Sequence, residues 1–509
     1  MRTLLSAAAL VFAACATPAA TPPAPAPAAG APEKTAPVAA AAAPEEDFRT
    51  QPPPGGPPVT FRAPVPQILK LKNGLTVWLL ERHDLPLVSM QLVVDSGSNT
   101  NPAGLPGVSS FVAAMLDEGT AKRDALATAT AFDDLAAIFH ADSDGETFTA
   151  ALSVPSASLA AALAIYADTV LHPAFKSADV ERVRKLRLGE LQQMNDDASQ
   201  VGRNVVARMI YGDKHPWGSP AKGTVESTRK VSRAALVAWH RTWVRPNNST
   251  LVVVGDVRQA DLVPLLESGF GTWTAGKLPS IKLPPPATQK AQTLVLVDKT
   301  AAAQSQVWLG QIGVSSSSPD LYATRLANTA LGSGKGRLSS NLRTKHAYSY
   351  GAYSFLIERR QEGAFVAFGG IVADKTPEAV QEFVAELSGI SKNGVTDTEL
   401  SEARSAAIQG LPARFESNDV TAASFGTAQG LGFGPEYFAT LPDKYLGVTK
   451  GQADQAAREH FAPERMPLVV VGPMESLASR LEALKLGPIQ WRDASGKLLS
   501  GPPKAKPAR

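Results

Sequence analysis

Histidines with a short, regular spacing could give this sequence metal chemistry, because two imidazoles one helical turn apart can hold the same ion. The sequence has seven histidines, and the closest two, His215 and His240, are 25 positions apart. No pair has the H-x-x-x-H spacing anywhere in the chain. A lone histidine is more often a surface or core residue, so we interpret His215, in the turn-rich stretch YGDKHPWG, as structural.

Phosphate chemistry is the next possibility, because GSGKG (residues 332–336) is rich in glycine and glycine lets backbone amides approach an anion closely. A phosphate-binding loop has the pattern G-x-x-x-x-G-K-[ST]. Here Lys335 is followed by Gly336, and Thr329 stands where the first glycine is required. We therefore interpret these glycines as a flexible loop that can face a substrate.

The composition is that of a globular protein, with 44% hydrophobic and 19% charged residues in 509. The formal net charge of +3 gives no general attraction to nucleic acid, so nucleic acid is excluded as a partner. The length allows several domains.

The N-terminus, MRTLLSAAALVFAAC, has a basic residue before an apolar run too short to span a membrane, which indicates an export signal. Its end resembles a bacterial lipoprotein signal, in which Cys15 would be acylated. The alternative is an ordinary secretory signal cut near Ala19 or Ala20. We expect a periplasmic protein, lipid-anchored to the outer membrane of a Gram-negative bacterium. Because Cys15 is the only cysteine, no internal disulfide can form.

Changes in composition divide the chain into successive parts, since Pro- and Ala-rich segments cannot bury enough apolar area to order themselves. The expected parts are a signal (1–15), a disordered tether (16–66), a first domain (67–276), a linker (277–290), a second domain (291–495) and a disordered tail (496–509).

Alternating apolar residues predict strands at 74–82 and 87–95, joined as a β-hairpin, and helical periodicity covers 105–118, 123–139, 156–170 and 177–195. A further helix is expected to end near Trp243, before the strand STLVVVGDV. Strands at TLVLVDK and QVWLGQIGV and a helix at LYATRLANTALG repeat this order. Pro246 and Pro463 each lie nine positions before a glycine that ends an LVVVG run. This repetition predicts an internal duplication.

The predicted helix at 105–118 has two different faces when residues are placed about 100° apart. The large apolar residues share one face, and Ser110, Ala113 and Ala114 share the other. The small face indicates either close packing or a cavity wall, and periodicity does not separate the two.

The predicted strands, the loop SGSNTNPAGLPG and the helix ending in MLDEGT resemble the start of the insulinase/pitrilysin family, which includes mitochondrial processing peptidase. The resemblance covers nearly all of residues 66–495. It implies an α+β fold of two duplicated domains, each a mixed, mostly antiparallel sheet with helices packed on it.

The family carries the zinc motif H-x-x-E-H on this helix. In register with MLDEGT its three positions are Ser110, Ala113 and Ala114, which offer neither imidazole ligands nor a general base. The resemblance places the remaining ligand, a glutamate, at Glu190, but one carboxylate cannot hold zinc alone. We therefore expect no metal and no cofactor in this chain, and no catalytic residue of its own.

The segment LGSGKGRLSSNLRTKHAYSYGAYSFL resembles the family's second-half motif, in which an arginine and a tyrosine seven positions later bind substrate. The resemblance assigns substrate binding to Arg343 and Tyr350. Without it, Arg343 is one exposed cation among several and Tyr350 one strand aromatic among several.

The combination resembles the non-catalytic chain of bacterial pairs in the family. It predicts a metal-free subunit that joins a homologous H-x-x-E-H subunit and acts on a peptide or unfolded protein at that partner's zinc. The alternative is a peptide-binding or scaffold protein of the cell envelope with no proteolytic role. A membrane contact is expected only through the lipid anchor.

Overall fold

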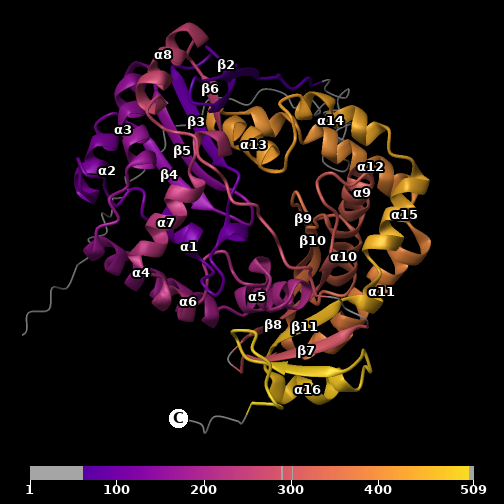
Figure 1. Ribbon diagram of the computed structural model, residues 1–509. Helices are drawn as coiled ribbons and strands as arrows, with labels where there is room; N and C mark the ends of the chain where they lie inside the picture. Colours follow the sequence, from indigo (N-terminus) through magenta and orange to yellow (C-terminus); the bar gives the residue numbers. More distant parts are fainter. Residues whose placement is uncertain (1–60, 288–290, 301, 504–509) are drawn as a thin grey trace, which may run out of the picture. The chain divides into compact units, whose positions relative to one another are not determined.

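Two sheets of six strands organise the described residues, which are 61–287, 291–300 and 302–503 of the computed structural model. The first sheet has the order β1-β2-β6-β3-β5-β4 (Figure 1). Its strands are β1 (Gln67–Lys70), β2 (Thr76–Glu81), β3 (Leu87–Val94), β4 (Ile138–Ser143), β5 (Phe148–Pro155) and β6 (Ser249–Gly255). The predicted signal with Cys15, and the predicted tether as far as residue 60, lie outside the described residues.

The second sheet repeats the first, with the order β12-β7-β11-β8-β10-β9. Its strands are β7 (Thr293–Asp298), β8 (Gln304–Ile312), β9 (Ser349–Ile357), β10 (Ala364–Val372), β11 (Pro467–Gly472) and β12 (Ile489–Arg492). In both sheets a fully buried LVVVG strand, β6 or β11, pairs parallel on one side and antiparallel on the other. The predicted duplication and fold class are confirmed.

Helices cover the sheets of both halves (Figure 1). In the first half they are α1 (Val108–Ala113), α2 (Ala125–Asp133), α3 (Leu159–Leu171), α4 (Ser177–Asp196), α5 (Ala198–Tyr211), α6 (Val225–Lys230), α7 (Arg233–Trp243) and α8 (Gln259–Phe270). In the second half they are α9 (Leu321–Gly332), α10 (Arg337–Ser339), α11 (Thr376–Asn393), α12 (Asp397–Gln409), α13 (Asn418–Gly430), α14 (Tyr437–Leu446), α15 (Lys450–His460) and α16 (Met474–Glu482). None of the described helices is both long and apolar enough to span a membrane.

The predicted hairpin is wrong, although both of its strands exist. β2 pairs with β1 and β6, and β3 pairs with β6 and β5, so β6 separates the two predicted partners. Every residue of β6 is buried, and a strand this apolar is most stable with a neighbour on each side. The short connection between β2 and β3 therefore crosses over β6 instead of closing a hairpin.

Some predicted helices have other boundaries. The prediction at 123–139 is too long, because α2 ends at Asp133 and β4 begins at Ile138, with Ala136 between them in the left-handed conformation (φ 51°). The prediction at 105–118 contains only α1, Val108–Ala113, followed by turns. The chain also packs earlier than expected, since Phe61 contacts Phe415, with ring centroids 5.3 Å apart.

The two halves exchange helices. From the first half, α5 packs on β8 and β11 of the second sheet, where Val205 and Ile210 share a core with Trp308 (Figure 1). From the second half, α13 packs on β3 and β6 of the first sheet. Each sheet is thus partly covered by a helix that the other half supplies.

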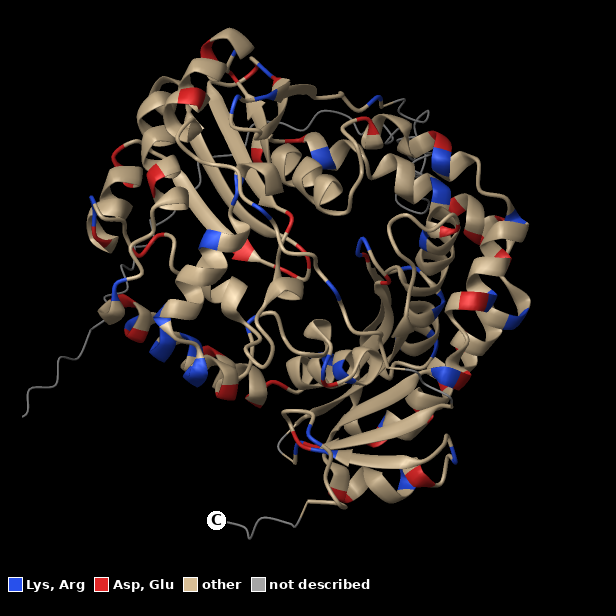
Figure 2. Ribbon diagram, viewed as in Figure 1, with Lys and Arg blue, Asp and Glu red and all other residues tan. Residues whose placement is uncertain are grey.

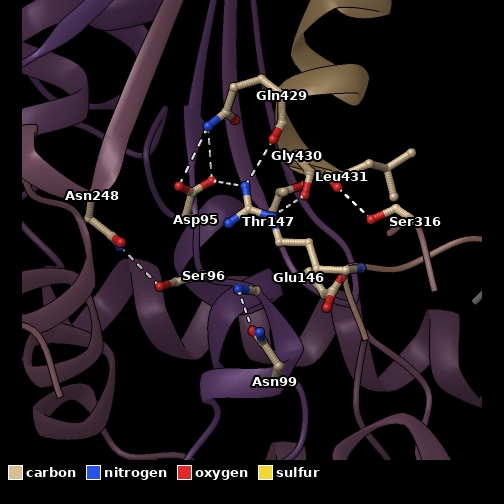
Figure 3. Close-up of polar contacts among 12 residues, drawn as sticks. Asp95, Ser96, Asn99, Glu146, Thr147, Asn248, Ser316, Gln429, Gly430 and Leu431 are labelled. Atoms are coloured by element: carbon tan, nitrogen blue, oxygen red, sulfur yellow. Dashed lines mark hydrogen bonds and ion pairs between the residues drawn. The ribbon is translucent and has the colours of Figure 1, made fainter. Parts of the chain in front are cut away.

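A polar contact adds to this exchange (Figure 3). Arg360, between β9 and β10, donates from Nη2 to Asp95 Oδ1 at 2.6 Å, and its backbone N–H donates to Glu146 Oε2 at 2.7 Å. Gln429 at the end of α13 donates to the same Asp95 carboxylate at 3.2 Å. The end of β3 is thereby bound to two segments of the second half.

Charged residues of both signs are interspersed along the helices of both halves (Figure 2). Local pairs such as Lys230 with Glu226 and Lys450 with Asp454 follow the i, i+4 spacing of helix surfaces.

Candidate functional site: the positions of the family's zinc ligands

At the start of α1 the chain has a position that requires glycine. Gly107, the N-cap of α1, has a φ of 95°, and a Cβ there would lie 2.5 Å from the carbonyl oxygen of Lys222. This contact sets the start of α1 directly against the segment at 220–223. The small face of α1 is therefore held at a fixed distance from that segment.

Ser110, Ala113 and Ala114 line one wall of a cavity of about 1020 Å³. Other walls come from β4, from α4 with Glu190, from α5 and from residues 220–222. The apolar face of α1 points the other way, with Val108, Phe111 and Val112 at most 1% exposed. The small face is thus a cavity wall, one of the two possibilities that the sequence left open.

A buried arginine is hydrogen-bonded to Ser110. Arg187 on α4 is 5% exposed and donates from Nη2 to Ser110 Oγ at 2.9 Å and to the carbonyl of Lys222 at 2.8 Å. Its Nη1 donates to the carbonyl of Ser110 at 3.3 Å. Ser110 in turn donates to the carbonyl of Ala221 at 2.9 Å. These bonds connect α1, α4 and the 220–222 segment.

The guanidinium of Arg187 also lies 5.0 Å from the ring centroid of Phe111, a cation–π contact. Burial lowers the pKa of Arg187 to about 10, and the negative charge of Glu190 opposes that shift. A pKa of about 10 keeps the guanidinium charged at neutral pH. The site therefore holds a fixed positive charge beside Ser110.

Glu190 lies at the edge of the same cavity and has a partner of its own. Its Oε2 accepts a hydrogen bond from Lys222 Nζ at 2.7 Å, and both side chains are about half exposed. The carboxylate that the family resemblance assigns to the metal is thus paired with an ammonium group.

Zinc does not fit these residues. A catalytic zinc needs three protein ligands of imidazole, thiolate or carboxylate type, and this wall offers one hydroxyl and two methyl groups. Two cations, Arg187 and Lys222, bind the groups that remain, and like charges repel a divalent ion. The side chains at these three positions therefore do not fit a zinc ion.

The described residues contain one group of side chains with closely spaced metal-ligating atoms, and it lies in the second half. Ligand atoms of Asp320, Glu459 and His460 lie within 4.8 Å of one another. His460 Nε2 and Asp320 Oδ2 already share a hydrogen bond at 2.5 Å. Neither residue lines the cavity beside α1.

His215 is a buried residue, which agrees with its structural interpretation. It is 4% exposed, its ring stacks on Tyr211 with centroids 5.0 Å apart, and its Nδ1 accepts the backbone N–H of Trp217 at 3.1 Å. Burial and the nearby positive charge of Arg359 lower its pKa to about 4. His215 is therefore neutral at neutral pH.

Arg343 and Tyr350 lie in the second half, and neither lines the cavity. Arg343 is exposed in a turn of π-helix (Ser340–Lys345), and Tyr350 is 85% exposed on β9. Neither side chain has a hydrogen bond or ion pair with another residue in the described part of the chain. The structure thus leaves both available for contact with another molecule.

Sequence reasoning missed Arg187 and Lys222. Arg187 lies three positions before Glu190, so the two share one face of α4, and this spacing was the available signal. Lys222 carried no such signal, because its contact with Glu190 joins residues 32 positions apart.

Two family patterns match this chain. Residues 76–219 match "Insulinase (Peptidase family M16)", and residues 230–407 match "Peptidase M16 inactive domain". Among similar proteins, an uncharacterised zinc protease of Mycobacterium tuberculosis is 24% identical over 425 residues, covering 82% of this chain and 96% of that protein. The β subunit of the mitochondrial-processing peptidase of Rattus norvegicus is 26% identical over 302 residues, covering 58% of this chain and 60% of that protein.

Solved structures share the fold. A peptidase M16 inactive domain from Pseudomonas fluorescens has a TM-score of 0.74 and 24% identity, covering 80% of this chain and 98% of that chain. A chain of complex III2 from Candida albicans has a TM-score of 0.68 and 13% identity, covering 82% of this chain and 99% of that chain. The two family patterns and the duplicated sheets lead to one conclusion: this chain belongs to the insulinase family, peptidase family M16.

Proposed function

We propose that this chain is the metal-free subunit of a two-chain zinc peptidase. A homologous partner supplies the H-x-x-E-H motif and the zinc, and this chain supplies Arg343 and Tyr350 to a peptide bound there. The contrast between two sites supports the proposal most. Arg187 is hydrogen-bonded to Ser110 at one of the positions of the metal ligands, whereas Arg343 and Tyr350 are exposed and have no side-chain partner in the described residues.

The proposed roles follow from the donors that these two side chains carry. The guanidinium of Arg343 and the hydroxyl of Tyr350 can donate hydrogen bonds to the carbonyl oxygen of a peptide. Negative charge grows on that oxygen as a nucleophile attacks the carbonyl carbon. Donors held at this position therefore bind the transition state more tightly than the ground state.

A second function is a peptide-binding or scaffold role in the cell envelope without proteolysis. The pairing of Glu190 with Lys222 supports this function as well as the first, because in both the carboxylate takes no part in hydrolysis. An adjacent gene for an H-x-x-E-H homologue, and cleavage by the two products together, would support the subunit role. The absence of both would support the scaffold role.

The experiment is co-expression of this chain with such a homologue, followed by cleavage of an unstructured fluorogenic peptide. We expect Arg343→Ala to lower kcat by about 100-fold, as loss of a transition-state donor does elsewhere, with unchanged assembly of the pair. Tyr350→Phe should lower kcat in the same direction. Lys345→Ala removes an exposed cation from the same turn and should stay within about twofold of the unsubstituted pair. Normal turnover of both the Arg343 and Tyr350 variants would remove the proposed contact.

We also propose that the chain is exported and anchored by a lipid on Cys15, with its folded part in the periplasm at the outer membrane. Incorporation of labelled palmitate into the chain, lost in Cys15→Ala, tests this anchor. A mature N-terminus beyond residue 15 would favour an ordinary secretory signal instead.

A further inference from the structure

A second cavity lies wholly within the second half, between β9 and helices α9, α13 and α14. Its volume is about 360 Å³, at the low end of the range for ligand pockets, so its size suits one side chain better than a cofactor. Four aromatic residues contribute to its walls, namely Phe355, Tyr437, Phe438 and Tyr445. Aromatic walls favour an aromatic guest, because offset and edge-to-face ring contacts add to the burial of apolar area.

The charged group inside this cavity, Arg325, already has hydrogen-bond partners within the protein. Arg325 is bound by Glu358 through two parallel hydrogen bonds of 2.6 Å, and its Nη1 also donates to the hydroxyl of Tyr437 at 2.6 Å. Burial raises the pKa of Tyr437 to about 12, so its hydroxyl stays neutral. A guest therefore meets a neutral interior and needs no charge of its own there.

One cation among the lining residues is not compensated. The guanidinium of Arg414 lies 6.0 Å from the ring centroid of Phe438 and is exposed. It has no hydrogen bond or ion pair with another residue of the described chain. A carboxylate next to the guest ring would find a partner in Arg414.

The cavity adjoins an open edge of the second sheet. β9 is the last strand in the sheet order, and its Phe355, 51% exposed, also lines the cavity. Tyr350 is five positions earlier on the same strand, which corresponds to about 17 Å at roughly 3.3 Å per residue. An extended peptide of about six residues along β9 is thus long enough to reach from Tyr350 to the cavity.

We propose that this cavity is a subsite for one aromatic side chain of an extended peptide, with a carboxylate of that peptide bound by Arg414. The subsite rests on the proposed function, because the same peptide contacts Tyr350. It adds a substrate class, namely unstructured segments with an aromatic residue for the cavity. This residue lies five or six positions from the peptide residue that contacts Tyr350, and a carboxylate lies next to it. The carboxylate belongs to an acidic side chain or to the C-terminus of the peptide.

The test is fluorescence anisotropy of labelled decapeptides that contain a single Phe followed by Glu, titrated with the full chain. Replacing Phe by Ala in the peptide should raise Kd at least tenfold. Replacing Glu by Gln, in amidated and free-acid peptides, distinguishes a side-chain carboxylate from a C-terminal one. Arg414→Gln should remove whichever carboxylate preference is found.

Two variants of the chain test the cavity itself. Thr427 lines the cavity from an exposed position of α13, so Thr427→Trp should fill it and weaken the Phe peptide about tenfold without affecting the Ala peptide. Thr440→Trp, at an exposed position of α14 that does not line the cavity, is the control and should change neither Kd. Circular dichroism and Tm check that both variants fold.

The outcomes separate the subsite from the function on which it rests. Equal affinity for the Phe and Ala peptides, with weaker binding in Tyr350→Ala, overturns the subsite and leaves the proposed function standing. Failure of every peptide to bind overturns the subsite, and the turnover of the Tyr350→Phe variant with its partner then tests the proposed function separately.

Discussion

At the scale of single residues, Ser110, at a position that the family resemblance assigns to a metal ligand, is hydrogen-bonded by the buried Arg187. Ser110 accepts from Arg187 and donates to Ala221, so the hydroxyl joins a network across three segments. The register of the helix with the family motif predicts that residues 110, 113 and 114 offer no metal ligand. The contact of Arg187 with Ser110 could not be predicted, because it joins residues 77 positions apart and local periodicity carries no information at that distance.

This network predicts that introducing the H-x-x-E-H motif at residues 110, 113 and 114 is not enough to give tight zinc binding. The triple variant Ser110→His, Ala113→Glu, Ala114→His should bind zinc weakly, because Arg187 and Lys222 keep two positive charges at the site. Adding Arg187→Leu and Lys222→Ala frees Glu190 and should tighten zinc binding by at least tenfold, measured by competition with a chromophoric chelator. Equal affinity in the triple and quintuple variants would show that the two cations do not oppose the metal.

Two buried histidines predict how stability depends on pH. His240 is 7% exposed and its Nε2 lies 2.8 Å from the carbonyl of Val170. Burial lowers the pKa of His240, and also that of His215, to about 4. Both folded values lie below the usual unfolded value of about 6.5, so the unfolded chain binds more protons between these limits.

The free energy of unfolding should therefore fall as the pH is lowered from about 6.5 towards 4. Each histidine contributes a slope of up to about 1.4 kcal/mol per pH unit. Urea unfolding of His215→Gln at pH 7 and pH 5, compared with the unsubstituted chain, isolates one of these slopes. An identical loss of stability in both proteins between pH 7 and pH 5 would contradict the lowered pKa of His215.

At the scale of elements, the strands and the duplication were predictable because their signals are local. Runs of β-branched residues and the repeated Pro-to-Gly spacing lie within short windows of sequence. Strand pairing was not predictable in the same way, since β6 inserts between β2 and β3 from a position more than 150 residues further along the chain. The packing of α5 and α13 on the sheet of the other half could not be predicted from local sequence either, because it depends on contacts between distant segments.

The packing of α5 on the second sheet can be tested at Gly202. A Cβ there would lie 2.5 Å from the ring atoms of Trp308. Gly202→Ala should therefore destabilise the chain by about 1–3 kcal/mol, as overpacking does, instead of stabilising a helix. Gly389→Ala in α11 meets no atom within 4 Å and should stabilise by about 0.5–1 kcal/mol. Tm and urea midpoints measure both, and a gain of stability in Gly202→Ala would contradict the close contact.

At the scale of the whole molecule, the two halves depend on each other for packing and for polar partners. Figure 3 shows Asp95 of the first half beside Gln429 of the second, with Glu146 of the first half also drawn. Arg360 connects these groups through charge-assisted hydrogen bonds, with its side chain 36% exposed. Partial exposure limits the strength of each bond.

Removal of this connection should loosen the contact between halves without unfolding either. Arg360→Ala should cost about 1–2 kcal/mol and accelerate amide hydrogen exchange at residues 144–147 and 429–431. The control is Arg480→Ala, which removes an exposed pair with Glu378 inside the second half. Exchange that is unchanged at both segments in Arg360→Ala, or equally faster in the control, would contradict a connecting role.

We expect no catalytic metal at Ser110, Ala113 and Ala114, so that any hydrolysis depends on a partner. The most direct measurement is X-ray anomalous diffraction at the zinc edge on crystals of the chain grown with zinc. We predict no anomalous peak within coordination distance of Ser110 or Glu190, and a hydrogen bond between Arg187 and Ser110 instead. A well-occupied zinc bound by Glu190 and other side chains of this molecule would contradict the account.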